Sequence, residues 1–112
     1  MSGPGVIVIG RVSCRPEQRE LLLELLGEMQ ERSRQEEGCI RYGFFEAVGA
    51  ENEFVAVEEW ASRGALEAHF AQSHLHEFAR RLPEAVTGAP EVALHEIAST
   101  GPFPGAGFGE GG

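Results

Sequence analysis

The chain has 112 residues, the length of one small domain, with 9 arginines and no lysine against 18 glutamates and no aspartate. Its formal net charge of -9 repels nucleic-acid phosphates and anionic lipid headgroups, so neither is expected as a partner. The N-terminal residues lead directly into strand-like sequence, without a signal peptide or an apolar stretch long enough to span a bilayer. We therefore expect a soluble, cytoplasmic protein.

The first part of the chain predicts a strand followed by a long helix. The run at residues 6–12 starts with β-branched, apolar side chains on both parities, which is typical of a strand covered on both faces. Pro16 suits the first turn of a helix that continues to about Glu36, and Gly38 supplies its C-terminal stop. Apolar side chains recur at helical spacing at Leu22, Leu25, Leu26 and Met29.

The central segment predicts a hairpin. Residues 39–46 are rich in aromatic side chains, residues 48–52 have the composition of a turn, and residues 54–60 form a second apolar run. Two strands joined by a short turn pair with each other, so we expect these segments to lie side by side in one sheet.

The segment after the hairpin predicts two short helices and a last strand. Ser62 is a plausible N-cap for a helix to about residue 71, and Ser73 for a helix from residue 74 to about 85. Gly88 and Pro90 are expected to end the helical region, and residues 92–97 to form the fourth strand. From residue 100 to residue 112 the chain is rich in glycine and proline, which predicts a flexible tail after a single domain of residues 1–99.

The order β-α-β-β-α-β predicts a ferredoxin-like α+β fold, in which helices cover one face of a four-stranded antiparallel sheet. Both faces of the predicted strands carry apolar side chains, as at Ile7 and Ile9 opposite Val6 and Val8. The helices can cover only one of these faces, and monomers rarely leave such a surface bare. We therefore expect a homodimer whose two sheets pack face to face.

Candidate functional groups gather at the end of the third predicted strand. Glu58 and Trp60 share one face of this strand by the two-residue period, and His69 and His74 lie on the helices that follow. A carboxylate is rarely buried without a partner, so a Glu58–imidazole pair is expected. The neighbouring strand can complete an aromatic wall with Tyr42 and Phe44.

Other kinds of site are disfavoured. The spacing of His69, His74, His76 and Glu58 matches no zinc motif, and Cys14 and Cys39 have neither CxxC nor zinc-finger spacing. The sequence contains no GxSxG nucleophile elbow and no glycine-rich phosphate loop after a strand. A metal site, nucleophilic catalysis and a nucleotide cofactor are therefore not expected.

Two stretches resemble the antibiotic biosynthesis monooxygenase domain, including its quinol monooxygenase branch. They are EEGCIRYGFFEA, residues 36–47, and FVAVEEWASRGALEAHFAQSHLHEF, residues 54–78, within a similarity that covers roughly residues 5–98. The resemblance implies a dimeric α+β barrel. It also implies oxidation of an electron-rich aromatic, a quinol or a polycyclic phenol, by dioxygen without flavin, haem or metal.

The resemblance also implies roles for particular residues. Trp60 matches a tryptophan that binds substrate in the polyketide-oxidising members, and Arg80 falls where those members carry a helical arginine. His69 and His74 resemble the quinol-oxidising branch. Ala56 and Leu66 replace an asparagine and a tyrosine of the polyketide-oxidising enzymes, whereas Gly10 and Ala79 fall where haem-degrading relatives carry an asparagine and an axial histidine, which disfavours haem cleavage.

These roles combine into a hypothesis for catalysis. His69 or His74, oriented by Glu58, removes a proton from the substrate hydroxyl, and the resulting anion transfers an electron to dioxygen. The Trp60 N–H and Arg80 stabilise the developing negative charge. Tyr42, Phe44 and Phe70 form the apolar wall around the aromatic ring.

The sequence leaves two alternatives open. One is a small-ligand-binding dimer without catalysis, and the other is a different enzyme on the same scaffold, such as an isomerase or a decarboxylase. One fold hosts many activities, so the predicted architecture does not choose among them.

Overall fold

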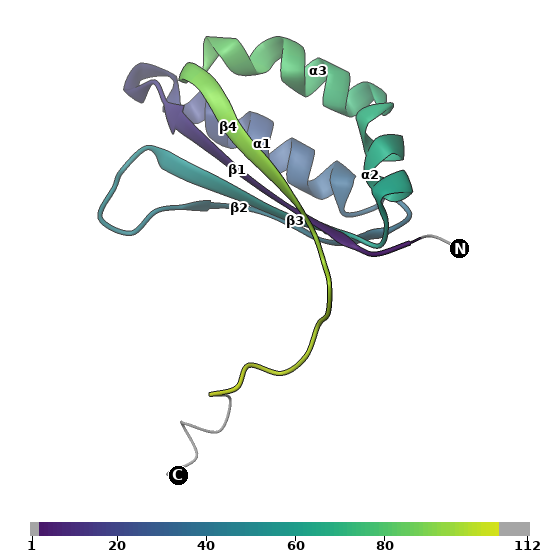
Figure 1. Cartoon of the computed structure of the whole chain (residues 1–112). Coiled ribbons are helices and arrows are strands. Elements are labelled where there is room, and N and C mark those ends of the chain that lie inside the picture. Colours follow the sequence, from purple (N-terminus) through teal and green to yellow (C-terminus); the bar gives the residue numbers. More distant parts are fainter. Residues whose placement is uncertain (1–2, 106–112) are drawn as a thin grey trace.

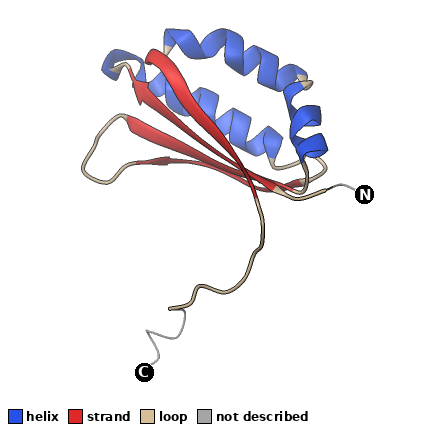
Figure 2. Ribbon diagram, viewed as in Figure 1, coloured by secondary structure: helices blue, strands red, loops and turns tan. Residues whose placement is uncertain are grey.

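The computed structural model describes residues 3–105 and contains the predicted order of elements (Figure 1). The neighbours in its antiparallel sheet follow the order β2-β3-β1-β4, and α1, α2 and α3 cover one face of that sheet (Figure 2). The fold is therefore the expected ferredoxin-like α+β arrangement. Its elements are β1 (Val6–Cys14), η1 (Pro16–Gln18), α1 (Arg19–Ser33), β2 (Cys39–Glu46), β3 (Glu53–Trp60), α2 (Arg63–Phe70), α3 (Ser73–Arg81), η2 (Leu82–Glu84) and β4 (Val86–Glu96).

Strand β4 is the element whose start was predicted wrongly. It begins at Val86, six residues before the predicted start, and includes Gly88 and Pro90. A proline lacks the N–H that a central strand needs, but β4 is an edge strand that pairs only with β1. The pairing shifts register between Arg11 and Ser13, and Gly88 has a positive φ of 73°. Gly88 and Pro90, the two residues expected to precede the strand, therefore lie in an irregular segment of β4.

The helix boundaries differ from the prediction by smaller amounts. Helix α1 ends at Ser33, three residues before the predicted end, and α3 gives way to the 3-10 turn η2 after Arg81. Ser62 caps α2 as expected, because its side-chain oxygen accepts a hydrogen bond of 3.0 Å from the backbone N–H of Ala65. The N-cap of α3 is Gln72, and Ser73 is its first helical residue.

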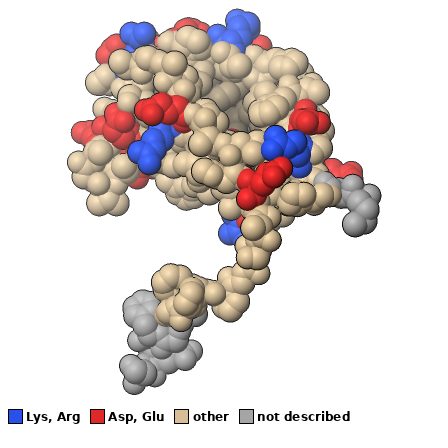
Figure 3. Space-filling model, in the orientation of Figure 1, with Lys and Arg blue, Asp and Glu red and all other residues tan. Residues whose placement is uncertain are grey.

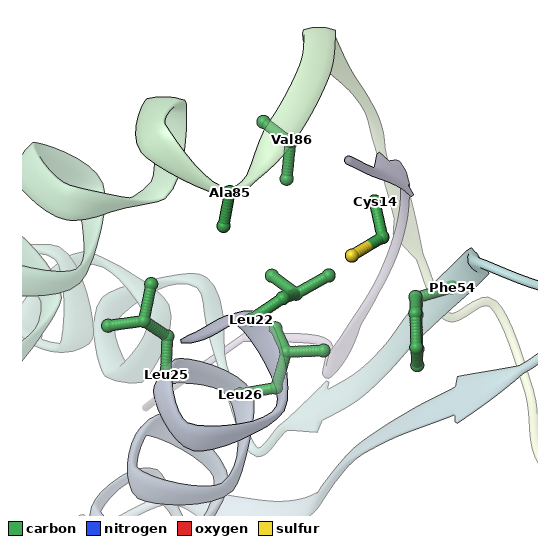
Figure 4. Close-up of a cluster of buried hydrophobic side chains, with 7 residues drawn as sticks. All are labelled: Cys14, Leu22, Leu25, Leu26, Phe54, Ala85 and Val86. Carbon is green, nitrogen blue, oxygen red and sulfur yellow. The ribbon is translucent and has the colours of Figure 1, made fainter. Parts of the chain in front are cut away.

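The core between sheet and helices consists of two clusters. The first, which we call the closed core, lies where the N-terminal half of α1 meets the end of β1 and the start of β4 (Figure 4). The second, which we call the aromatic core, lies toward the other end of the sheet, under α2. The closed core contains Cys14, Leu22, Leu25, Leu26, Phe54, Ala85 and Val86, and the aromatic core contains Val6, Val8, Met29, Tyr42, Trp60 and Leu66.

The sheet face turned away from the helices is uncovered and carries an apolar patch. Ile9 pairs with Val57, and Val55 pairs with both Arg11 and Phe45, so these side chains adjoin one another across three strands. The Phe45 side chain is 59% exposed, and no helix among residues 3–105 covers this face (Figure 2). The sequence-based expectation of a second apolar face is confirmed.

The remaining described residues lead away from the domain. After β4 the chain extends outward without forming a further helix or strand up to residue 105 (Figure 1). The rest of the predicted tail, residues 106–112, lies outside the described residues. Within residues 3–105, no helix combines the length and the apolar character required to cross a bilayer.

Candidate functional site

The middle of the sheet carries small side chains where the helices pass over it. Gly10 of β1 pairs with Ala56 of β3 on one side and with Val92 of β4 on the other. Ala56 in turn pairs with Phe44 of β2. A hydrogen and a methyl group do not fill the space up to the helices, so a gap remains above this row between the two core clusters.

This gap is a cavity of about 200 Å³. Its walls come from all four strands, from α1, α2 and α3 and from η2, and most of the lining side chains are apolar. Figure 3 shows a hollow between α3, α2 and β4 whose visible walls are neither acidic nor basic. The lining residues are Val8, Gly10, Arg11, Val12, Leu26, Tyr42, Phe44, Ala56, Glu58, His69, Phe70, Leu75, Phe78, Leu82, Pro90 and Val92.

Glu58 brings a carboxyl group to this apolar cavity. Its Oε1 accepts a hydrogen bond of 3.0 Å from Nε1 of Trp60, whose side chain is completely buried. Burial raises the pKa of Glu58, while the Trp60 hydrogen bond and the nearby imidazole of His69 oppose that rise. Glu58 therefore retains its proton to a higher pH than an ordinary glutamate.

A second carboxylate, Glu36, holds both histidines. Its Oε2 lies 2.7 Å from Nδ1 of His69 and 2.7 Å from Nε2 of His74. The His69 side chain is 1% exposed, and those of Glu36 and His74 are 10% and 14% exposed. The two imidazoles therefore share one largely buried carboxylate oxygen.

The backbone before β2 explains how Glu36 reaches the histidines. Gly38 has a φ of +86°, and a Cβ at this position would lie 2.5 Å from the Cβ of Ala65. Only glycine combines this conformation with such a close approach to α2. His69 lies one helical turn after Ala65 on the same side of α2, so the segment that passes Ala65 at Gly38 places Glu36 beside His69.

The shared carboxylate determines which imidazole nitrogens carry protons. An ionised Glu36 can only accept hydrogen bonds, so Nδ1 of His69 and Nε2 of His74 must both donate. In neutral His69 the other nitrogen, Nε2, then carries a lone pair. His69 lines the cavity, whereas His74 is not among the lining residues and faces the outer clefts beside α1.

Aromatic rings surround His69. The ring of Trp60 lies 4.5 Å from it and the rings of Tyr42 and Phe70 lie 5.6 and 5.9 Å away, measured between centroids. Phe44 packs edge-on against Tyr42 at 5.5 Å. All of these residues except Trp60 line the cavity, so the predicted aromatic wall stands beside the imidazole.

The structure corrects three expected interactions. The Glu58–imidazole pair is wrong, because Glu58 binds Trp60 and Glu36 holds the histidines. The Trp60 N–H is already donated to Glu58. Arg80 does not line the cavity, since it is exposed on α3 and forms an ion pair with Glu77 one turn earlier.

Glu36 is the site residue that sequence reasoning missed. The sequence pattern places it at the end of the first helix, where a glutamate is expected to belong to the solvated face. The available signal was Gly38, because a glycine at a helix C-terminus reverses the chain and takes the preceding residues off the helix axis. Which surface that reversed segment would contact depends on the tertiary packing against α2.

The group of Glu36, His69 and His74 also has the composition of a metal site. One ligand atom from each residue lies within 4.8 Å of the others, and two imidazoles with a carboxylate suit zinc or iron. In the structure, however, both N–H groups point at the same carboxylate oxygen, so the three groups satisfy one another as a hydrogen-bonded unit.

Comparisons with known proteins agree with the architecture and with the resemblance. A structure of Rv0793 from Mycobacterium tuberculosis is 30% identical and superposes with a TM-score of 0.80, covering 86% of this chain and 97% of that one. The uncharacterized protein sll1783 of Synechocystis is 34% identical over 95 residues, which are 85% of this chain and 65% of that protein. The chain thus spans slightly less than two thirds of sll1783.

One further relative and one family profile have descriptions that name a monooxygenase. The Bacillus subtilis protein named "Putative monooxygenase YcnE" is 30% identical over 92 residues, which are 82% of this chain and 97% of YcnE. The profile described as "Antibiotic biosynthesis monooxygenase" matches residues 5–81, which include the whole Glu36, Glu58, Trp60, His69 and His74 constellation. The chain therefore belongs to the antibiotic biosynthesis monooxygenase family.

Proposed function

We propose that this protein is a monooxygenase that oxidises an electron-rich aromatic hydroxyl compound with dioxygen and without a bound cofactor. The observation that carries the proposal is the buried imidazole of His69, which lines an apolar cavity and is held from behind by Glu36. A cavity of about 200 Å³ lies below the roughly 300–1,000 Å³ of sites for drug-sized ligands. This size favours a quinol of one or two rings over a larger polycyclic phenol.

His69 is the proposed general base. Because Nδ1 donates to Glu36, Nε2 is the nitrogen that takes the proton from a substrate hydroxyl in the cavity. Glu36, 2.7 Å from Nδ1, holds the imidazole ring in place during this transfer. His74 fixes the position of the Glu36 carboxylate from the other side.

The substrate supplies all the electrons for the reaction. A phenolic hydroxyl with an ordinary pKa of about 10 is mostly protonated at neutral pH, and its anion reduces dioxygen far more readily than the neutral form does. A quinol that gains one oxygen atom and becomes a hydroxyquinone loses four electrons. Those four electrons reduce both atoms of dioxygen, one of which enters the product while the other leaves as water, so the balance needs no external reductant.

The proposal includes a homodimer with the architecture of a dimeric α+β barrel. The uncovered face around Ile9, Val55, Val57 and Phe45 provides an apolar surface that a second copy can bury. A two-fold axis through this face would bring the same surface of the two copies into contact, as in most homodimers. Sedimentation at micromolar concentration is expected to give twice the protomer mass, and a stable monomer there would contradict this part.

Oxygen uptake with menadiol tests the proposed reaction. Purified protein treated with EDTA and given no cofactor should consume dioxygen faster than the spontaneous oxidation of menadiol. The product mass should rise by one oxygen atom relative to menadione. Peroxide with unmodified menadione would show an oxidase instead, and uptake that disappears with EDTA and returns with a metal ion would show that Glu36 and the histidines bind that metal.

A comparison of substrates separates the proposal from ligand binding alone. A tricyclic hydroxyanthrone should react more slowly than menadiol because of the cavity size. Tight binding of quinones without any protein-dependent oxygen uptake would identify a non-catalytic binding dimer. A haem titration without a change in the Soret band is expected, since neither Gly10 nor Ala79 offers a ligand atom in its side chain.

A further inference from the structure

Glu58 has a free oxygen at the cavity. Its Oε1 accepts the Trp60 N–H, and no hydrogen bond from residues 3–105 reaches its Oε2. Glu58 belongs to the helix-facing row of the sheet, where it pairs with Val8 of β1 and Tyr42 of β2. The carboxyl group therefore has one side fixed by the indole and the other side available to a ligand.

No cation pairs with this carboxyl group within the described part of the chain. The titratable groups near it are His69 from α2, Tyr42 and Cys39 from β2, and Glu36 from the segment before β2. Arg11 of β1 also lines the cavity. Burial in these surroundings raises the pKa of Glu58, and the negative charge of Glu36 acts in the same direction. The surroundings thus stabilise the neutral carboxylic acid relative to a glutamate in water.

We propose that Glu58 acts as a neutral carboxylic acid that donates a hydrogen bond to one oxygen of an aromatic ring, while His69 meets another oxygen of the same ring. The ligand class is then a quinol or quinone of one or two rings, with oxygen functions at two ring positions. The identity of the ring rests on the proposed function. The hydrogen-bond donor does not, because a quinone binds without any turnover.

The physical basis is the difference between a carboxylic acid and a carboxylate. A quinone carbonyl can only accept hydrogen bonds, so a carboxylate would repel it and a carboxylic acid would bind it. In an apolar cavity this difference is larger than in water, because the surrounding side chains offer few competing polar groups. Glu36 and Glu58 consequently have opposite tasks: the first accepts from two imidazoles, and the second donates to the ligand.

Trp60 supplies a readout that needs no catalysis. It is the one tryptophan of the chain, and it contacts both Glu58 and His69. Quenching of its fluorescence measures binding of 2,3-dimethyl-1,4-naphthoquinone, whose filled ring positions prevent addition to cysteine. 2,3-Dimethylnaphthalene is the matched ligand without oxygens and should bind at least tenfold more weakly.

Two variants separate the effect of the Glu58 hydrogen-bond donor on binding from the effect of its charge. Glu58→Gln keeps an N–H donor toward the ligand and an oxygen toward Trp60, so it should bind the quinone within about threefold of the wild-type affinity. Glu58→Leu removes the donor and should lose about tenfold or more in quinone affinity, with no such loss for the hydrocarbon. Far-ultraviolet circular dichroism establishes that each variant is folded.

The pH dependence provides the second test. Wild-type affinity for the quinone should be constant at low pH and fall as the pH rises through the elevated pKa of Glu58, because the donor is then lost. The Glu58→Gln affinity should not change over the same range. An affinity in Glu58→Gln as low as in Glu58→Leu, or a wild-type affinity that increases with pH, would overturn the assignment.

The outcomes distinguish this inference from the proposed function. Quinone binding that depends on Glu58 as described, together with no oxygen uptake from menadiol, would sustain the inference and remove the monooxygenase. Oxygen uptake together with equal affinity for the quinone and the hydrocarbon would sustain the monooxygenase and overturn the inference about Glu58.

Discussion

The closed core and the aromatic core lie under the same layer of helices but differ in what they contain. The closed core consists of apolar side chains and one cysteine, all at most 5% exposed. The aromatic core packs as tightly around Trp60 and Leu66, yet it adjoins Glu58, His69 and a cavity. The first region shows complete packing, whereas the second shows packing interrupted where polar groups face an open volume.

This difference separates a region that stabilises the fold from the region that holds the candidate site. Helix α1 contributes Leu22, Leu25 and Leu26 to one cluster and Met29 to the other, so both regions share a rigid element. A cavity forgoes burial and van der Waals contacts, which costs free energy of folding. The closed core offsets that cost, and Leu26 is the one of its seven members that also lines the cavity.

The largest expected effect comes from removing the imidazole at the cavity. His69→Ala should lower the rate of protein-dependent menadiol oxygenation by about 10²- to 10⁴-fold, the usual contribution of a general base. The measurement is oxygen uptake under saturating menadiol. His76→Ala on exposed α3 is the matched control and should retain the wild-type rate. Equal rates in the two variants would mean that the base lies elsewhere.

A change in the closed core should instead affect stability. Leu22 is completely buried, and Leu22→Ala should lower the free energy of unfolding by about 2–5 kcal/mol in urea denaturation. Leu23→Ala, on the 45% exposed neighbour, should cost no more than about 0.5 kcal/mol. The folded Leu22→Ala protein should still bind a naphthoquinone with wild-type affinity, and a large loss there would show that the two regions are coupled.

The sequence predicted most of the fold because its signals are local. The spacing of Leu22, Leu25 and Leu26 specifies the buried side of α1, and the Ser62 cap specifies the start of α2. It failed at β4, since Pro90 is compatible with a strand only at a sheet edge. Edge position is a property of the assembled sheet and leaves no local signal.

The candidate site was predicted only in part, because only some of its residues follow from local patterns. Residue type and strand parity placed Glu58, Tyr42 and Phe44 on the cavity side. The partner of His69 could not be found this way, because Glu36 lies 33 positions away and reaches it through the contact of Gly38 with α2. Local periodicity identifies the face of an element, but the partner across the core depends on how the elements pack.

The size of the cavity gives a smaller and more specific prediction. A Cβ at Gly10 would lie 3.6 Å from Val92 and 3.7 Å from Ala56, so Gly10→Ala fits the sheet and fills part of the cavity floor. We expect about tenfold weaker binding of a two-ring quinol and a smaller change for single-ring hydroquinone. Gly27→Ala adds the same methyl group on exposed α1, where nothing lies within 4 Å, and should change neither affinity.

The smallest expected effects distinguish two carboxyl groups by the sign of their pH dependence. Glu46, at the end of the hairpin near the closed core, bonds Arg19, and this contact lowers the pKa of Glu46 to about 2. Its contribution to stability is present above the ordinary glutamate pKa of about 4.3 and is lost as the pH falls toward 2. Glu46→Gln should therefore lower stability at neutral pH and flatten the loss on acidification.

Glu58 should behave in the opposite way. Its pKa is raised in the folded protein, so the native state binds the proton more tightly than the unfolded chain does. The resulting stability is fully present below the unfolded pKa and is lost as the pH rises through the folded pKa. Urea midpoints of wild type and Glu58→Gln should diverge in that window, with Glu58→Gln gaining stability relative to wild type at higher pH. Parallel curves of urea midpoint against pH would mean that Glu58 is hydrated like the carboxyl groups on the surface. The distinction between the closed core and the aromatic core would then rest on the cavity and His69 alone.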